Sequence, residues 1–272
     1  MATQRSVFVK GCWETNQIGE ALANQIFDKI EMFAGYGFNK SHSACYGHIS
    51  YWTAYLKANH PVEFLAALLS NEINNTDKIS VFIAECHRMQ IEILPPDTNE
   101  SELRFVPEKT PSGGSAIRYG LAAIKNVGGH AMALLIEERN MNGKFASLDD
   151  LSNRMDSRVV NKRILENLIR AGALDWTGET RSTMFQRLES VISGAASLQR
   201  DRASGQVSLF DSLDFSSPQQ FSAKHTQYPE WSKDDRLTQE KELLGYYVSG
   251  HPLDKFRRLM SADKFLSLIH IS

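Results

Sequence analysis

The 272-residue sequence lacks the features that mark several common classes of protein. Its three cysteines, Cys12, Cys45 and Cys86, lie far apart and form no CxxC pair, which argues against a zinc site and against a disulfide framework. No apolar run approaches the roughly 20 residues of a membrane span, and residues 1–10 lack the apolar stretch of a signal peptide. The sequence therefore predicts a protein of a reducing cytoplasm, with no metal site and no membrane partner.

The sequence also lacks a basic excess. Its 30 Lys and Arg against 32 Asp and Glu give a formal net charge of -2. Nucleic-acid-binding proteins are often basic overall, so net charge gives no support to DNA binding, although a local basic patch can lie on a neutral body. The 42% apolar and 23% charged residues are typical of a globular protein with one large core or two small ones.

Helical periodicity dominates the sequence and predicts a mainly α fold with a few short strands. Apolar residues recur at three- and four-residue spacing over the ranges 18–33, 45–56, 61–69, 77–86, 161–171, 180–198 and 232–245. The face expected to be buried in the first range carries Ile18, Leu22, Ile26, Ile30 and Phe33. Asp77 is expected to cap the fourth helix. Short strands are expected at 91–94, 103–106 and 117–119.

The stretch Ala123-Ile-Lys-Asn-Val-Gly-Gly-His-Ala131 has the pattern of a helix-hairpin-helix. Small residues let such a hairpin approach a DNA strand closely, and the free N–H groups at the start of the next helix point at a phosphate. The contacts hold the DNA backbone and read no sequence. The residues expected to bind DNA here are Lys125, Asn126, Val127, Gly128 and Gly129. The plainer alternative is a turn between helices that needs glycine.

A second, less clear hairpin precedes Lys162 and Arg163 and runs on to Ala171-Gly-Ala173. The two cations are expected to flank the same duplex. Alternatively, both are ordinary solvent-exposed cations at the start of a helix. Together the two hairpins predict a tandem DNA-binding region.

Residues 199–222 are rich in Ser, Gln and Asp and predict a flexible linker. Within it, Gln206-Val-Ser-Leu-Phe210 is similar to the short motif by which bacterial proteins bind the sliding clamp. Exposed apolar pairs in flexible segments often serve as docking anchors. The clamp-binding residues expected are Gln206, Ser208, Leu209 and Phe210. Alternatively, Leu209 and Phe210 fold back onto this chain.

A candidate nucleotide site lies at Phe38-Asn-Lys-Ser-His-Ser43, which follows a Gly-Tyr-Gly break. Ser41 is expected to cap the next helix, whose N-terminus with Lys40 and His42 would form an anion site. A triphosphate is a suitable ligand, and Asn39, Lys40, Ser41 and His42 are the nucleotide-binding candidates. The alternative is a helix cap beside two surface cations.

These segments together resemble one family in order and extent. Residues 33–42, 51–57 and 60–67 are similar to the fingers of bacterial DNA polymerase III alpha subunits, the C-family replicative polymerases. Residues 94–99, 119–128, 161–175, 206–210 and 245–254 continue the resemblance, which covers about 5–258. The organisation it implies is helical fingers at 1–105, tandem hairpins at 106–178, a helix at 179–198, the linker at 199–222, the start of a following domain at 223–265, and a non-native or truncated tail at 266–272.

The resemblance implies a DNA-directed DNA polymerase whose partners are primer–template DNA, an incoming deoxynucleoside triphosphate, the β sliding clamp and other holoenzyme subunits. In the family, palm aspartates hold two Mg²⁺ ions. No Asp-x-Asp pair is present, and Asp149-Asp150 and Asp234-Asp235 are adjacent. The palm precedes the fingers, so no catalytic residue is expected here, and this stretch alone is expected to be inactive.

Three alternatives remain open. A helix-hairpin-helix DNA glycosylase would use an Asp near the position of Asp149, but its Gly/Pro-rich loop is missing. A non-enzymatic DNA-binding module is a stronger alternative than the glycosylase, and it would describe this stretch taken in isolation. An error-prone paralogue of the polymerase is disfavoured by the clamp motif, which that paralogue generally lacks.

Overall fold

The computed structural model describes residues 2–35, 39–110, 112–203 and 227–256. Packing divides the chain into two units, Met1–Asn59 and His60–Ser272. Along the described residues the fold is mainly α with a few short strands, as the sequence predicts.

The first unit contains three helices, α1 (Ala2–Asn16), α2 (Glu20–Gly35) and α3 (Lys40–Asn59). The rings of Phe8 and Phe27, 5.5 Å apart, pack α1 against α2. The apolar face predicted for the helix at 18–33 is only partly covered, since Ile18 and Ile26 are half-buried. Ala23 and Phe27 are buried, whereas Leu22, Ile30 and Phe33 of the predicted face are exposed. The reason is that α1 covers the face next to the predicted one.

The second unit begins with α4 (Pro61–Asn71) and α5 (Thr76–Arg88). Pro61 stands in the first turn of α4, where its missing N–H costs nothing. Asn75 caps α5 by accepting from the backbone N–H of Lys78, so the predicted Asp77 cap is wrong by two residues. The buried face of α5 consists of Ile79, Ile83 and Cys86.

A three-stranded sheet follows, with β1 (Glu92–Leu94), β2 (Val106–Lys109) and β3 (Ser115–Arg118) in the order β1-β3-β2. β3 is parallel to β1, with Ile93 opposite Ile117, and antiparallel to β2. The strands predicted at 103–106 and 117–119 are shifted by two or three residues, because short apolar runs do not fix strand ends.

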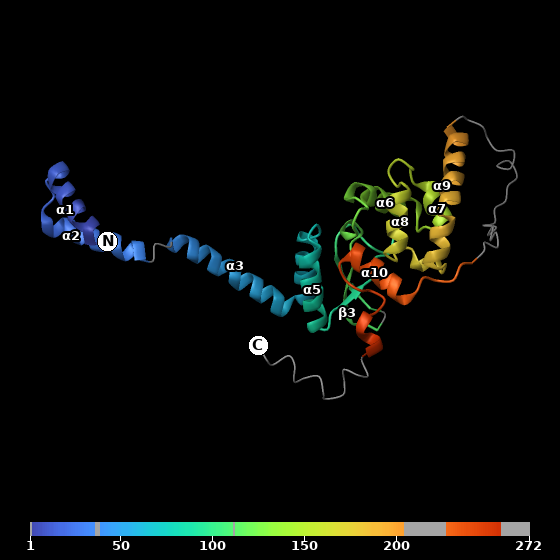
Figure 1. Ribbon diagram of the computed structural model, residues 1–272, viewed down its shortest axis with the longest axis horizontal. Coiled ribbons are helices and arrows are strands. Elements are labelled where there is room, and N and C mark those ends of the chain that lie inside the picture. Colours follow the sequence, from blue (N-terminus) through green and yellow to red (C-terminus); the bar gives the residue numbers. More distant parts are fainter. Residues whose placement is uncertain (1, 36–38, 111, 204–226, 257–272) are drawn as a thin grey trace. The chain divides into compact units, whose positions relative to one another are not determined.

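The remaining elements are helical. They are η1 (Leu121–Ala123), α6 (Gly129–Asn142), α7 (Leu148–Arg154), α8 (Lys162–Arg170), η2 (Asp175–Thr177), α9 (Arg181–Ala203), α10 (Lys233–Leu244) and η3 (Pro252–Phe256). Figure 1 shows α6, α7, α8 and α9 grouped together, with α10 returning beside α8. The first residues of the predicted linker 199–222 belong to α9, which ends at Ala203, and the rest lie outside the described residues.

One hydrophobic core runs through this unit, from Leu65 on α4 to Tyr246 after α10. Leu243 and Leu244, at the end of α10, are 1% and 0% exposed. The described part of 223–265, predicted as the start of a following domain, therefore packs into the same core as the hairpins. No described helix combines the length and the apolar character needed to cross a membrane.

Candidate nucleic-acid interface

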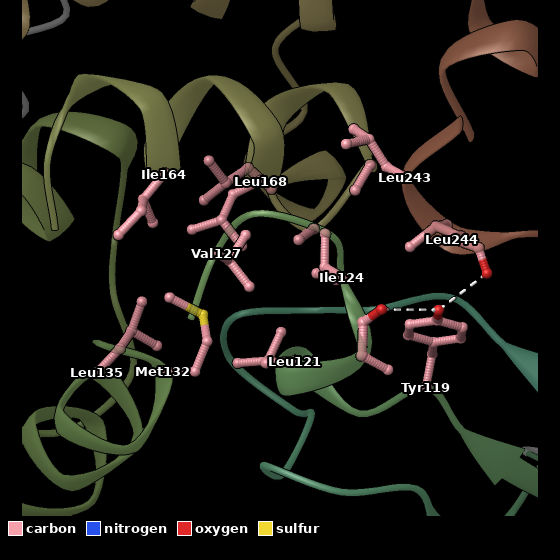
Figure 2. Close-up of a cluster of buried hydrophobic side chains, with 14 of the residues drawn as sticks. Tyr119, Leu121, Ile124, Val127, Met132, Leu135, Ile164, Leu168, Leu243 and Leu244 are labelled. Atoms are coloured by element: carbon pink, nitrogen blue, oxygen red, sulfur yellow. Dashed lines mark hydrogen bonds between the residues drawn. The ribbon is translucent and has the colours of Figure 1, made fainter. Parts of the chain in front are cut away.

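The first hairpin connects η1 to α6 over residues 124–128. Two of these residues, Asn126 with φ 65° and Gly128 with φ 73°, have left-handed backbone conformations, which turn the chain tightly. Ile124 and Val127 are 2% and 1% exposed. Figure 2 shows both side chains directed into the core, where Leu168 of α8 lies. The hairpin is thus fastened by the two apolar residues, and the residues between and after them face solvent.

The exposed face of this hairpin carries Lys125, Asn126, Gly128, Gly129 and His130. Gly128 is the N-cap of α6, and no side chain caps that helix start. A β carbon on Gly128 would meet no atom within 4 Å. Among the described residues, none occupies this helix start, so its first N–H groups are available to an anion.

Val127 belongs to the predicted DNA-binding set but has a buried side chain. Its contribution to a DNA contact is therefore limited to its backbone. The sequence pattern does not reveal this, because an apolar residue in a glycine-rich turn is equally suited to a buried anchor and to an exposed contact.

The second hairpin connects α7 to α8 over residues 155–161. Ser147 caps α7 through the N–H of Asp150, and Asn161 caps α8 through the N–H of Ile164. Lys162 and Arg163 are exposed in the first turn of α8. The Nζ of Lys162 lies 3.5 Å from a carboxylate oxygen of Glu189 on α9.

A groove with a volume of about 600 Å³ lies between the second hairpin and α9. Its lining includes Arg154, Arg158 and Arg200, with Asp156 the one acidic side chain among the lining residues. Nε of Arg158 donates to Oδ1 of Asp156 and Nη2 donates to Oδ2, and this hydrogen bonding lowers the pKa of Asp156 to about 2. Arg158 and Arg200 are not among the residues predicted to bind DNA, because α9 brings Arg200 to the hairpin from a distant part of the chain.

The candidate nucleotide site lies at the start of α3 in the first unit. Asn39, not Ser41, caps this helix, because its side-chain oxygen accepts from the N–H and the hydroxyl of Ser41 at 3.0 and 2.6 Å. Lys40 is exposed, and the ring of His42 lies 4.3 Å from that of Tyr46. The four predicted residues therefore share one helix end, with Asn39 and Ser41 already bonded to each other.

The predicted clamp-binding residues Gln206, Ser208, Leu209 and Phe210 lie outside the described residues. In the part of the chain that is described, no group of three or more His, Cys, Asp or Glu side chains is placed to hold a metal ion.

Comparison with protein families supports the hairpin geometry. A family described as "Helix-hairpin-helix motif" matches residues 90–184. The match includes both hairpins and ends within α9. It leaves α10 and the segment after it outside the motif.

Curated proteins similar to this chain carry the name "DNA polymerase III subunit alpha". The protein of Borreliella burgdorferi is 44% identical over 261 residues, which cover 96% of this chain and 22% of that protein. Those of Vibrio cholerae and Escherichia coli K12 are 42% and 41% identical over 256 residues, or 94% of this chain and 22% of each relative. The chain thus spans about a fifth of the length of these relatives.

Proposed function

We propose that this chain binds duplex DNA by contacting the phosphate backbone of the DNA. The chain is homologous over almost its whole length to a segment of bacterial DNA polymerase III alpha subunits, and we propose that it serves this role as part of such a polymerase. The observation that carries the proposal is the first hairpin. Its exposed, uncapped helix start lies beside Lys125, and Gly128 leaves room for close approach. The match of residues 90–184 to the helix-hairpin-helix family supports it.

Such an interface holds DNA without reading its sequence. N–H groups of a helix start and Lys or Arg side chains contact phosphates, which every sequence presents alike. Further positive charge lies on and beside the second hairpin. It comes from Lys162 and Arg163 and from the groove lined by Arg158 and Arg200. A net charge of -2 does not oppose this, because the positive groups are local.

The experiment is equilibrium binding of the 272-residue chain to two fluorescent duplexes of unrelated sequence. We expect similar affinities for both, with dissociation constants of about 10⁻⁴ to 10⁻⁶ M near physiological salt. A strong preference for one sequence would contradict a backbone-only interface. Absence of binding to either duplex would refute the proposed function.

We further propose the partners implied for the whole enzyme. The start of α3, with Asn39, Lys40, Ser41 and His42, would face the triphosphate of an incoming nucleotide. The Gln206 to Phe210 motif would dock on the β sliding clamp, and other holoenzyme subunits would complete the assembly in the bacterial cytoplasm. Mg²⁺ chemistry would belong to the whole enzyme, and we assign no chemical step to the described residues.

The clamp proposal has a matched control within the same stretch of sequence. Leu209→Ala combined with Phe210→Ala should abolish retention on clamp-coated beads. Leu213→Ala combined with Phe215→Ala removes the same two side-chain types a few residues later and should leave retention unchanged. Equal retention of the chain and the first double variant would refute this use of the motif.

Among the alternatives, the glycosylase is opposed by a contact in the structure. An oxygen of Asp149 accepts from Arg187 on α9 at 2.7 Å, which engages the carboxylate in an ion pair. A DNA-binding module without catalysis is not favoured, because the relatives that match almost the whole chain carry the name of a polymerase subunit. The name shared by the relatives supports a replicative polymerase as the whole protein.

A further inference from the structure

The end of α10 contacts the first hairpin directly, although α10 lies outside the residues matched by the helix-hairpin-helix family. The last carbonyls of an α-helix have no partner within the helix and must find one elsewhere. The carbonyl of Leu243 accepts the backbone N–H of Lys125 at 3.0 Å. The carbonyl of Leu244 accepts the hydroxyl of Tyr119 at 2.9 Å. The end of α10 is therefore capped by the chain that enters the hairpin.

Tyr119 joins the two sides of this contact. Its hydroxyl also lies 3.3 Å from the carbonyl of Ala123, the last residue of η1, so its single proton is shared between that carbonyl and the carbonyl of Leu244 (Figure 2). Burial raises the pKa of Tyr119 well above its usual value, which keeps the hydroxyl a donor. The ring is fully buried and packs on Phe105 at 4.7 Å between centroids.

These bonds fix the two residues that flank Ile124. With the carbonyl of Ala123 and the N–H of Lys125 both held, the backbone on each side of Ile124 has a defined position. The fixed backbone around Ile124 in turn determines where the exposed Lys125 and Asn126 lie. In the absence of α10, the N–H of Lys125 would lose its acceptor, and the turn would gain conformational freedom.

We propose that Tyr119 and the end of α10 are positioning elements for the first hairpin, holding it in the conformation that receives a DNA phosphate. The inference rests on the proposed DNA binding and deepens it. A preorganised loop binds more tightly because less freedom is lost on binding. DNA affinity at this hairpin thus depends on α10, which follows residues 204–226 in the sequence.

The test compares two substitutions in the full 272-residue chain. Tyr119→Phe removes only the hydroxyl that bridges Ala123 and Leu244. Tyr246→Phe is the matched control, because its ring stacks on Tyr119 at 5.7 Å while its buried hydroxyl has no hydrogen-bond partner among the described residues. We expect Tyr119→Phe to weaken duplex binding by about two- to tenfold, the range of one hydrogen bond, and Tyr246→Phe to leave it unchanged.

A double-mutant cycle separates positioning from a general loss of structure. Lys125→Glu should weaken binding by a smaller factor in the Tyr119→Phe chain than in the unmodified chain. Lys162→Glu, on the second hairpin, should cost the same factor in both. Such selective coupling would not arise from a uniform destabilisation.

Two outcomes would overturn the inference while leaving the proposed function in place. One is duplex binding by Tyr119→Phe equal to that of the unmodified chain. The other is equal coupling of Tyr119→Phe to Lys125→Glu and to Lys162→Glu. An unmodified chain that does not bind duplex DNA would instead overturn the proposed function, and this inference with it.

Discussion

Arg181 and Glu240 form a buried ion pair, with Nη1 and Oε1 3.0 Å apart and side chains 4% and 0% exposed. Arg181 also donates to both oxygens of Asp175, at 2.9 and 2.7 Å. The second oxygen of Glu240 accepts the N–H groups of Val248 and Ser249. The pair therefore joins the start of α9 to α10 and to the segment after it, across the stretch 204–226.

Glu240→Ala should destabilise the second unit by about 3 kcal/mol, because it removes the fully buried partner of Arg181 and leaves Asp175, which is half-exposed, to balance that charge among the described residues. The N–H groups of Val248 and Ser249 would lose their acceptor as well. Guanidinium unfolding measures the loss. Glu242→Ala is the control, since Glu242 pairs with Arg170 on the surface with 61% of its side chain exposed, and it should cost below about 1 kcal/mol. Similar costs for both variants would contradict the buried role of Glu240.

Two glycines test the space around Arg181. Gly172 and Gly178 have φ of 79° and 75°, so alanine is strained at each by about 1–2 kcal/mol. A β carbon on Gly172 would also clash with Nη2 of Arg181, whereas one on Gly178 would meet nothing within 4 Å. Gly172→Ala should therefore lower the free energy of unfolding more than Gly178→Ala. Equal losses would show that Arg181 moves aside without cost.

Asp156 restrains Arg158 in the groove beside the second hairpin. Because the pKa of Asp156 is lowered to about 2, the carboxylate contributes fully to stability above its unfolded pKa, and this contribution falls as pH drops below that value and is lost once pH falls through about 2. Above about pH 2 the carboxylate of the folded protein stays ionised. Mild acid therefore does not release Arg158, but Asp156→Asn does. This variant should bind duplex DNA more tightly, with a salt slope about 0.9 more negative for one added phosphate contact.

The control for this charge change is Asp149→Asn. It removes the same charge from α7 but beside Arg187, whose side chain is only 11% exposed. We expect its DNA affinity to change less than that of Asp156→Asn. If Asp156→Asn bound duplex DNA no better than the unmodified chain, the groove would not be part of the interface.

The sequence predicts best those features that local groups determine. The helix from Asn161 and the helix from Ser232 to Gly245 are confirmed within a residue or two, because their caps are encoded beside them. The mainly α fold and the position of the first hairpin follow in the same way from periodicity and glycine.

Contacts between distant segments could not be read from the sequence. The choice of Phe27 over Ile30 as a buried residue depends on where α1 packs. The burial of Val127, the groove shared by Arg158 and Arg200, and the contact of Leu243 with Lys125 each require the assembled core. Periodicity reports which residues share a face and leaves open which partner covers it.

The salt dependence of duplex binding tests most directly the claim that the hairpins hold DNA by its phosphates. The logarithm of the affinity of the unmodified chain should fall linearly with the logarithm of salt concentration. Lys125→Glu should make that slope shallower by about 0.9, the share of one phosphate contact. Lys78→Glu, the same charge change on α5, should leave the slope unaltered. A slope that is the same in all three chains would contradict the account.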